Sequence, residues 1–170
     1  MRSRILSLWL PDLATDRLLR STRRAAGGHD AGRGEAAWDP KRPLATFVNH
    51  QGALRLEALC ARARAAGLAP GMMLADARAM VPALQVHAAE PAAAVRLLED
   101  LAAWCERYTP YVALDRSHEH AAGGGLWLDI TGCAHLFGGE AALREDLLAR
   151  LCRQGLAAAV AIADTPGAAW

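Results

Sequence analysis

The stretch that decides the fold is GGGLWLDITGCAHLFGGE, which runs from Gly123 to Glu140. Its apolar first half contains a single acid, Asp129, and a glycine-containing turn separates it from Glu140. This pattern predicts a buried β-strand, a turn and the start of a helix. A catalytic site built on such a strand would need carboxylates near its beginning, and glycines stand there instead.

Length and composition limit the class of protein. A chain of 170 residues is about one domain, or one domain with a small neighbour. The net charge of +1 does not indicate a nucleic-acid binder. No apolar run reaches the ~18 residues of a membrane span, and the basic and apolar N-terminus is interpreted as a first strand rather than an export signal. We therefore expect a cytoplasmic protein.

The cysteines are widely spaced and form no CxxC motif, which favours free thiols over a zinc site or a disulfide framework. They are Cys60, Cys105, Cys133 and Cys152. The His118–Glu119–His120 segment offers too few ligands for a metal site and is interpreted as a solvated loop. The glycines at 123–125 precede a strand and no GK[ST] follows, so they are not a phosphate-binding loop.

Hydrophobic periodicity predicts the remaining elements. Strands are expected over 5–10, 44–49, 54–59, 84–87, 111–114, 125–130 and 156–163. Helices are expected over 12–24, 60–66, 74–80, 91–105 and 140–153, and residues 24–42 are expected to form a flexible loop. This order predicts an α+β fold, in which helices cover one face of a sheet and a small helical insert follows the hairpin at 44–59.

Four blocks together resemble one family, the Y-family translesion DNA polymerases, and are closest to its ImuB branch. The blocks are RILSLWLPDLATDRL, GLAPGMMLADARAMVPALQV, GLWLDITGCAHLFGG and AAAVAIADTPGAAW, in that order along nearly the whole chain. The resemblance implies a polymerase palm with a ferredoxin-like mixed sheet at 1–48 and 84–170. It also implies a fingers-like insert at 49–83, with the thumb, the little finger and the C-terminal tail absent from this chain.

The resemblance also indicates what has happened to the catalytic acids. Active relatives hold two metal ions with an Asp-x-Asp pattern on the first strand and an Asp-Glu pair on a later one. The corresponding positions here are Trp9, Pro11, Gly124 and Gly125. Asp129 matches a later family acid and is interpreted as structural. We therefore expect no catalytic residue, no metal and no cofactor.

The groups that grip the nucleotide triphosphate in active relatives are also mostly replaced. Ala61 stands for a tyrosine, and Pro166 and Trp170 stand for lysines, whereas Arg64 matches the family arginine. Arg64 is therefore the one vestigial phosphate contact that the resemblance leaves.

The leading hypothesis is a non-catalytic scaffold subunit of a bacterial DNA-damage-induced mutasome. The resemblance implies three partners: an ImuA-like RecA-related protein, a replicative-type error-prone DNA polymerase, and a sliding clamp that binds a C-terminal region absent here. Two alternatives stay open. One is an active translesion polymerase using Asp12, Asp115 or Asp129, and the other is a DNA-binding module whose Arg62 and Arg64 contact phosphate.

Overall fold

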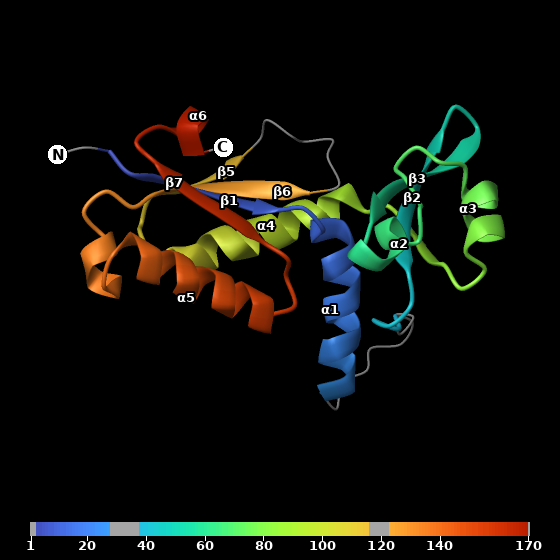
Figure 1. The fold of residues 1–170 in the computed structure, drawn as a ribbon, viewed down its shortest axis with the longest axis horizontal. Helices are drawn as coiled ribbons and strands as arrows, with labels where there is room; N and C mark the ends of the chain where they lie inside the picture. Colours follow the sequence, from blue (N-terminus) through green and yellow to red (C-terminus); the bar gives the residue numbers. More distant parts are fainter. Residues whose placement is uncertain (1–2, 28–37, 116–122, 170) are drawn as a thin grey trace. The chain divides into compact units, whose positions relative to one another are not determined.

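The computed structural model describes residues 3–27, 38–115 and 123–169. The chain forms two compact units, shown as a ribbon in Figure 1. The first unit comprises Met1–Pro11 and Ala92–Trp170, and the second comprises Asp12–Pro91. No helix within the described residues is both long enough and apolar enough to cross a membrane.

The first unit is built on a four-stranded antiparallel sheet with the strand order β5-β6-β1-β7. Its strands are β1 (Ile5–Leu10), β5 (Val112–Asp115), β6 (Gly124–Asp129) and β7 (Ala159–Ala163). The apolar run of β1 has neighbours on both sides, since Leu8 pairs with Leu126 of β6 and with Val160 of β7. The central position of β1 explains why it is apolar along its whole length.

Two long helices, α4 (Pro91–Cys105) and α5 (Glu140–Arg153), cover one face of this sheet (Figure 1). The short helix α6 (Pro166–Ala169) packs against β1 and β7 on the other face, and the 3₁₀ helix η1 (Ala134–Phe137) precedes α5. Each buried leucine of such a core contributes about 1.5–3 kcal/mol. The fully buried leucines here are Leu6, Leu8, Leu10, Leu126, Leu128, Leu143, Leu147 and Leu151.

The second unit has its own three-stranded sheet, with the order β3-β2-β4. Its elements are α1 (Leu13–Gly27), β2 (Leu44–His50), β3 (Ala53–Leu59), α2 (Ala61–Ala65), α3 (Leu74–Met80) and β4 (Gln85–Ala88). The expected hairpin is present, and its turn residues Gln51 and Gly52 have φ values of 52° and 81°. Two consecutive positive φ values are typical of the two-residue hairpin turn.

The second unit is larger than the helical insert that we expected over 49–83. Strand β2 pairs with β3 on one side and runs parallel to β4 on the other, so these strands cannot be divided between two units. Leu18 of α1 lies in the same buried cluster as Leu44 of β2, which brings the first helix into this unit as well. Pairing between distant strands is not encoded in local periodicity.

The first residues of the segment expected to form a loop over 24–42 are helical. Helix α1 continues to Gly27, and the Trp38 backbone N–H donates to the Thr22 hydroxyl at 2.8 Å. Residues 28–37, and the His118–His120 segment, lie outside the described residues. All four cysteines are free thiols, and Cys60 and Cys105 are buried.

Candidate functional site

The candidate site is the face of the four-stranded sheet that α4 and α5 do not cover, here called the open face. Side chains alternate across a strand, so residues paired directly across the ladder share a face. Leu6, Leu8 and Leu10 of β1 are fully buried and point to the other side. The open face therefore takes Ser7 and Trp9 of β1, together with Ala113, Asp115, Gly125, Trp127, Asp129, Ala159 and Ala161.

Trp9 lies on the open face near the end of β1, in a space that Gly123 leaves for its indole ring. A Cβ on Gly123 would stand 2.7 Å from the Leu10 carbonyl oxygen and 2.7 Å from the indole carbon Cζ2 of Trp9. Both distances are too short for any real side chain. The indole ring therefore requires a residue without a side chain at position 123.

Gly125 pairs directly with Trp9, but the side chain that lies against it is that of Asp115 and not the indole ring. A Cβ on Gly125 would lie 3.2 Å from Asp115 Cβ and 3.4 Å from Asp115 Oδ2. A larger side chain here would have to displace Asp115.

The structure separates the four positions that the resemblance assigned to metal-binding acids. Trp9 and Gly125 share the open face as a cross-strand pair. Gly124 is buried and pairs with Leu10, on the side of the helices. Pro11 follows the last residue of β1 and is exposed.

The acids proposed for an altered metal site do not converge. Asp115 pairs with Gly125, whereas Asp129 lies four residues further along β6 and pairs with Ile5. At about 3.3 Å per residue, this offset is roughly 13 Å along the strand. The Asp129 carboxylate accepts the Thr131 backbone N–H at 2.9 Å, and hydrogen bonding to Thr131 lowers its pKa.

No group of three or more His, Cys, Asp and Glu side chains within the described part of the chain is arranged to hold a metal ion. The third proposed acid, Asp12, is a residue of the second unit and has a different partner.

That partner is Arg64. Its guanidinium donates to both carboxylate oxygens of Asp12, at 2.7 and 2.9 Å, and to the Leu59 carbonyl oxygen at 2.6 Å. The Asp12 side chain is only 7% exposed, whereas that of Arg64 is 48% exposed. The hydrogen bond from Asp12 raises the pKa of Arg64. Arg64, the expected vestigial phosphate contact, therefore donates hydrogen bonds to both oxygens of a carboxylate of this chain. A phosphate group would bind an arginine with the same bidentate geometry.

A cavity of about 260 Å³ lies beside Trp9 on the open face. Among the described residues its walls carry no charged side chain, and those that line it are Ser7, Trp9, Ala159, Val160, Ala161 and Ala169. The methyl side chains of β7 and α6 leave this space open next to the indole ring. Ser7, which is 5% exposed, contributes a hydroxyl group to this lining.

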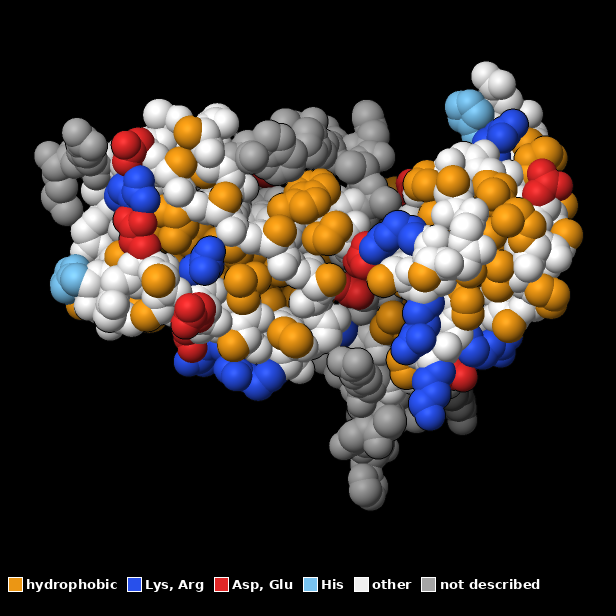
Figure 2. Space-filling view, in the orientation of Figure 1, with side chains coloured by type: hydrophobic (Ala, Val, Ile, Leu, Met, Phe, Trp, Pro, Cys, Tyr) orange, Lys and Arg blue, Asp and Glu red, His pale blue; other side chains and the backbone are white. Residues whose placement is uncertain are grey.

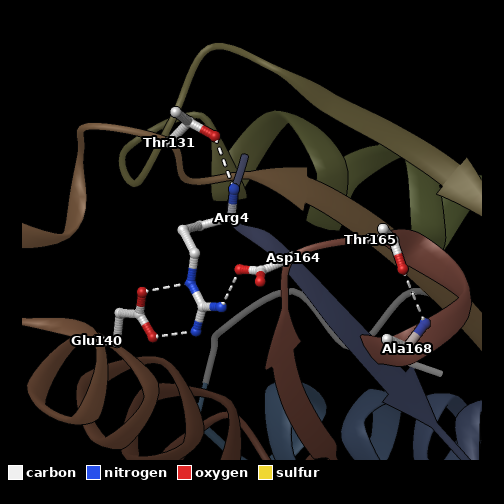
Figure 3. A network of polar contacts seen from close by, with 6 residues as sticks. All are labelled: Arg4, Thr131, Glu140, Asp164, Thr165 and Ala168. Carbon is white, nitrogen blue, oxygen red and sulfur yellow. Dashed lines mark hydrogen bonds and ion pairs between the residues drawn. The ribbon is translucent and has the colours of Figure 1, made fainter. Parts of the chain in front are cut away.

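A polar network at the start of β1 holds the surrounding elements in place, and Figure 3 shows it from close by. The Arg4 guanidinium donates through Nε and Nη2 to Glu140 of α5, at 2.7 and 2.6 Å. Its Nη1 donates at 2.6 Å to Asp164, in the turn between β7 and α6. These bonds raise the pKa of Arg4 and lower that of Glu140.

Sequence analysis missed this network, because Arg4 lies 136 residues from Glu140 and 160 from Asp164. Asp164 lies two residues before α6, and Ala169 of α6 lines the cavity.

Comparison with solved structures defines the class of fold. The insertion ternary complex of Dbh DNA polymerase matches with a TM-score of 0.64 at 11% identity, covering 94% of this chain and 42% of that one. DinB from Sulfolobus solfataricus matches with a TM-score of 0.58 at 12% identity and the same coverage. The fold is therefore that of the Y-family DNA polymerases, as the four sequence blocks predicted.

Comparison of sequences gives the family. The profile of the impB/mucB/samB family matches residues 40–170, and the chain belongs to this family. Two curated proteins, both called "Protein ImuB" and both from strains of Caulobacter vibrioides, are 52% identical over 104 residues. This alignment covers 61% of the chain but 21% of each relative, so the chain spans about a fifth of the length of the curated relatives it matches.

Proposed function

We propose that this chain belongs to a non-catalytic, polymerase-like scaffold that acts in the response to DNA damage. The observation that carries the proposal is the occupation of the open face. Trp9, whose indole ring lies against Gly123 and which pairs across the ladder with Gly125, occupies the region where the family resemblance puts metal-binding acids. Two divalent cations close together need several anionic oxygens, and an indole ring supplies none.

The Asp12–Arg64 pair supports the same proposal from the second unit. An arginine already satisfied by a nearly buried carboxylate has to lose that partner before it can bind a triphosphate. Removing the partner would leave the Asp12 carboxylate unpaired and largely out of water, which is costly. The ion pair therefore disfavours nucleotide binding at Arg64.

The charge distribution also argues against DNA on the open face. The four strands of this sheet carry two acidic residues, Asp115 and Asp129, and no lysine or arginine. Residues 1–11 and 92–170 together contain eight arginines and ten acidic residues, which is a formal charge of −2. A surface of this sign repels the phosphate backbone.

The ImuB relatives suggest the setting in which such a scaffold works. By analogy with that branch, we propose a cytoplasmic mutasome that contains an ImuA-like RecA-related protein and a replicative-type error-prone polymerase. A sliding clamp would be a further partner of this assembly.

A primer-extension assay with the full-length protein tests the absence of catalysis. We expect no incorporation above the protein-free blank with Mg²⁺ or Mn²⁺, whereas a catalytically active Y-family polymerase extends the same primer. Extension that is lost in the Asp12→Ala or Asp115→Ala variant would show an altered but working metal site, and would overturn the proposal.

A second candidate function, DNA binding without catalysis, is favoured by the charge of the second unit. Residues 12–91 contain eleven basic and eight acidic residues, a formal charge of +3. Arg62 donates to the Pro40 carbonyl oxygen and Arg64 to Asp12, so both are already engaged. A salt-dependent mobility shift of primed DNA that weakens in Arg62→Ala would support this function.

A further inference from the structure

We propose that the cavity beside Trp9 is the docking site for a peptide segment of a protein partner, one that carries a large apolar anchor residue between basic residues. This inference deepens the proposed scaffold function and rests on it in one respect, namely that the open face is not needed for nucleotide or metal. It assigns a surface and a partner chemistry to that function.

The shape and lining of the cavity suit a single apolar anchor. The space of about 260 Å³ is bounded by the Trp9 ring and by the methyl groups of Ala159, Ala161 and Ala169. Aromatic rings and branched aliphatic side chains pack well against an indole, and such anchors in concave pockets dominate the energy of protein interfaces. Figure 2 shows hydrophobic side chains gathered over the middle of this unit on the viewed face, with charged groups toward its end and lower edge.

A polar group inside the cavity also points to a ligand. Ser7 is 5% exposed and is one of the residues that line the cavity, so its hydroxyl group is available to a ligand there. A peptide backbone beside the anchor supplies both a donor and an acceptor for it.

Charge selects a basic peptide over the alternatives. The strands of the open face carry Asp115 and Asp129 and contain no lysine or arginine. Nucleic acid would bring phosphates to an acidic surface. A second copy of this chain would bring the same acidic face, so self-association here is disfavoured for the same reason.

The test follows peptide binding to the ¹⁵N-labelled chain by NMR. The probes are the peptide KKSGWGSKK, its acidic counterpart EESGWGSEE, and oligo(dT). We expect KKSGWGSKK to shift the Trp9 indole N–H and the Ala159 and Ala161 amides saturably, and EESGWGSEE to bind about tenfold more weakly.

Two variants at exposed positions on edge strands distinguish the effect of filling the cavity from the effect of adding a positive charge to the open face. Ala161→Arg fills the cavity from β7, and Ala113→Arg puts the same charge on the open face from β5, outside the cavity. An exposed edge strand tolerates such a charge, and the spectrum of each free variant verifies its fold. Ala161→Arg should weaken KKSGWGSKK about tenfold or more, and Ala113→Arg by about threefold or less.

The proposal is overturned if neither peptide shifts these signals, if the two variants weaken binding equally, or if oligo(dT) saturates the same signals. Failure of the scaffold function itself would instead appear as primer extension, which is a separate readout. The two failures are therefore distinguishable.

Discussion

Replacing Gly123 by alanine tests the packing around Trp9 on the open face. The backbone of Gly123 does not have a positive φ, so alanine introduces no conformational strain there. The cost comes only from the new Cβ, which would meet the Leu10 carbonyl oxygen and the Trp9 ring carbon Cζ2, each at 2.7 Å. The ring can tilt away, but the oxygen belongs to the backbone of β1 and is held by the sheet.

Overpacking of this kind typically costs about 1–3 kcal/mol. For a chain of this size, each kcal/mol lowers the midpoint of thermal unfolding by about 2–4 °C. We therefore expect Gly123→Ala to lower the midpoint of thermal unfolding by roughly 2–12 °C. Scanning calorimetry of the variant and the parent chain measures this difference directly.

Gly167→Ala is the matched control, because a Cβ at Gly167 of α6 would meet nothing within 4 Å. Its midpoint should stay the same or rise slightly, since alanine restricts the unfolded chain. In the double variant Trp9→Leu/Gly123→Ala, the effect of alanine should shrink but persist, because the contact with the Leu10 oxygen remains. An unchanged midpoint in Gly123→Ala would refute the arrangement of Trp9 over a required glycine.

Three further predictions concern the ion pairs and the thiols. Arg64→Met should destabilise the second unit by about 1–3 kcal/mol in urea unfolding, because it leaves the nearly buried Asp12 carboxylate without a partner. Asp12→Asn should destabilise the unit less, because water can reach the Arg64 side chain that it leaves unpaired. Equal losses of stability in the two variants would contradict this reasoning. The pKa of Glu140 is lowered by Arg4, so the stabilisation from this pair is present above about pH 4.3 and is lost as the pH falls through the lowered pKa. The difference in urea midpoint between the parent chain and Glu140→Gln should therefore shrink from about pH 7 to about pH 3. Burial raises the pKa of the Cys105 thiol to about 12, so iodoacetamide should modify the exposed Cys152 in the native chain and reach Cys105 only after unfolding, as peptide mass spectrometry can measure.

Local patterns predicted most elements of the fold. Helices α3 and α5 begin and end where the sequence placed them, because Pro82 and Gly155 terminate strongly periodic segments. Strand β7 begins at Ala159 rather than at Leu156. The division into units was not predictable, since it depends on the parallel pairing of β2 with β4, which lie about 40 residues apart.

The candidate site was predictable only in part. The family blocks identified the positions of Trp9 and Gly125, but not that Gly123 rather than Gly124 accommodates the indole ring. The sequence suggested Asp12 as a helix cap or a catalytic acid, and its carboxylate instead binds Arg64, 52 residues away. Contacts over such separations follow from tertiary packing, which no local pattern contains.

The bond between Asp12 and Arg64 constrains how this sequence can change over time. Replacing Arg64 leaves the nearly buried Asp12 carboxylate without its partner. Replacing Asp12 releases Arg64 but restores none of the other residues that bind a triphosphate in active relatives. Each single substitution therefore lowers stability or brings no gain in function, so we expect the two positions to be substituted together or not at all. On the proposed function, Arg64 would be retained because it keeps Asp12 paired, and not because it binds a nucleotide.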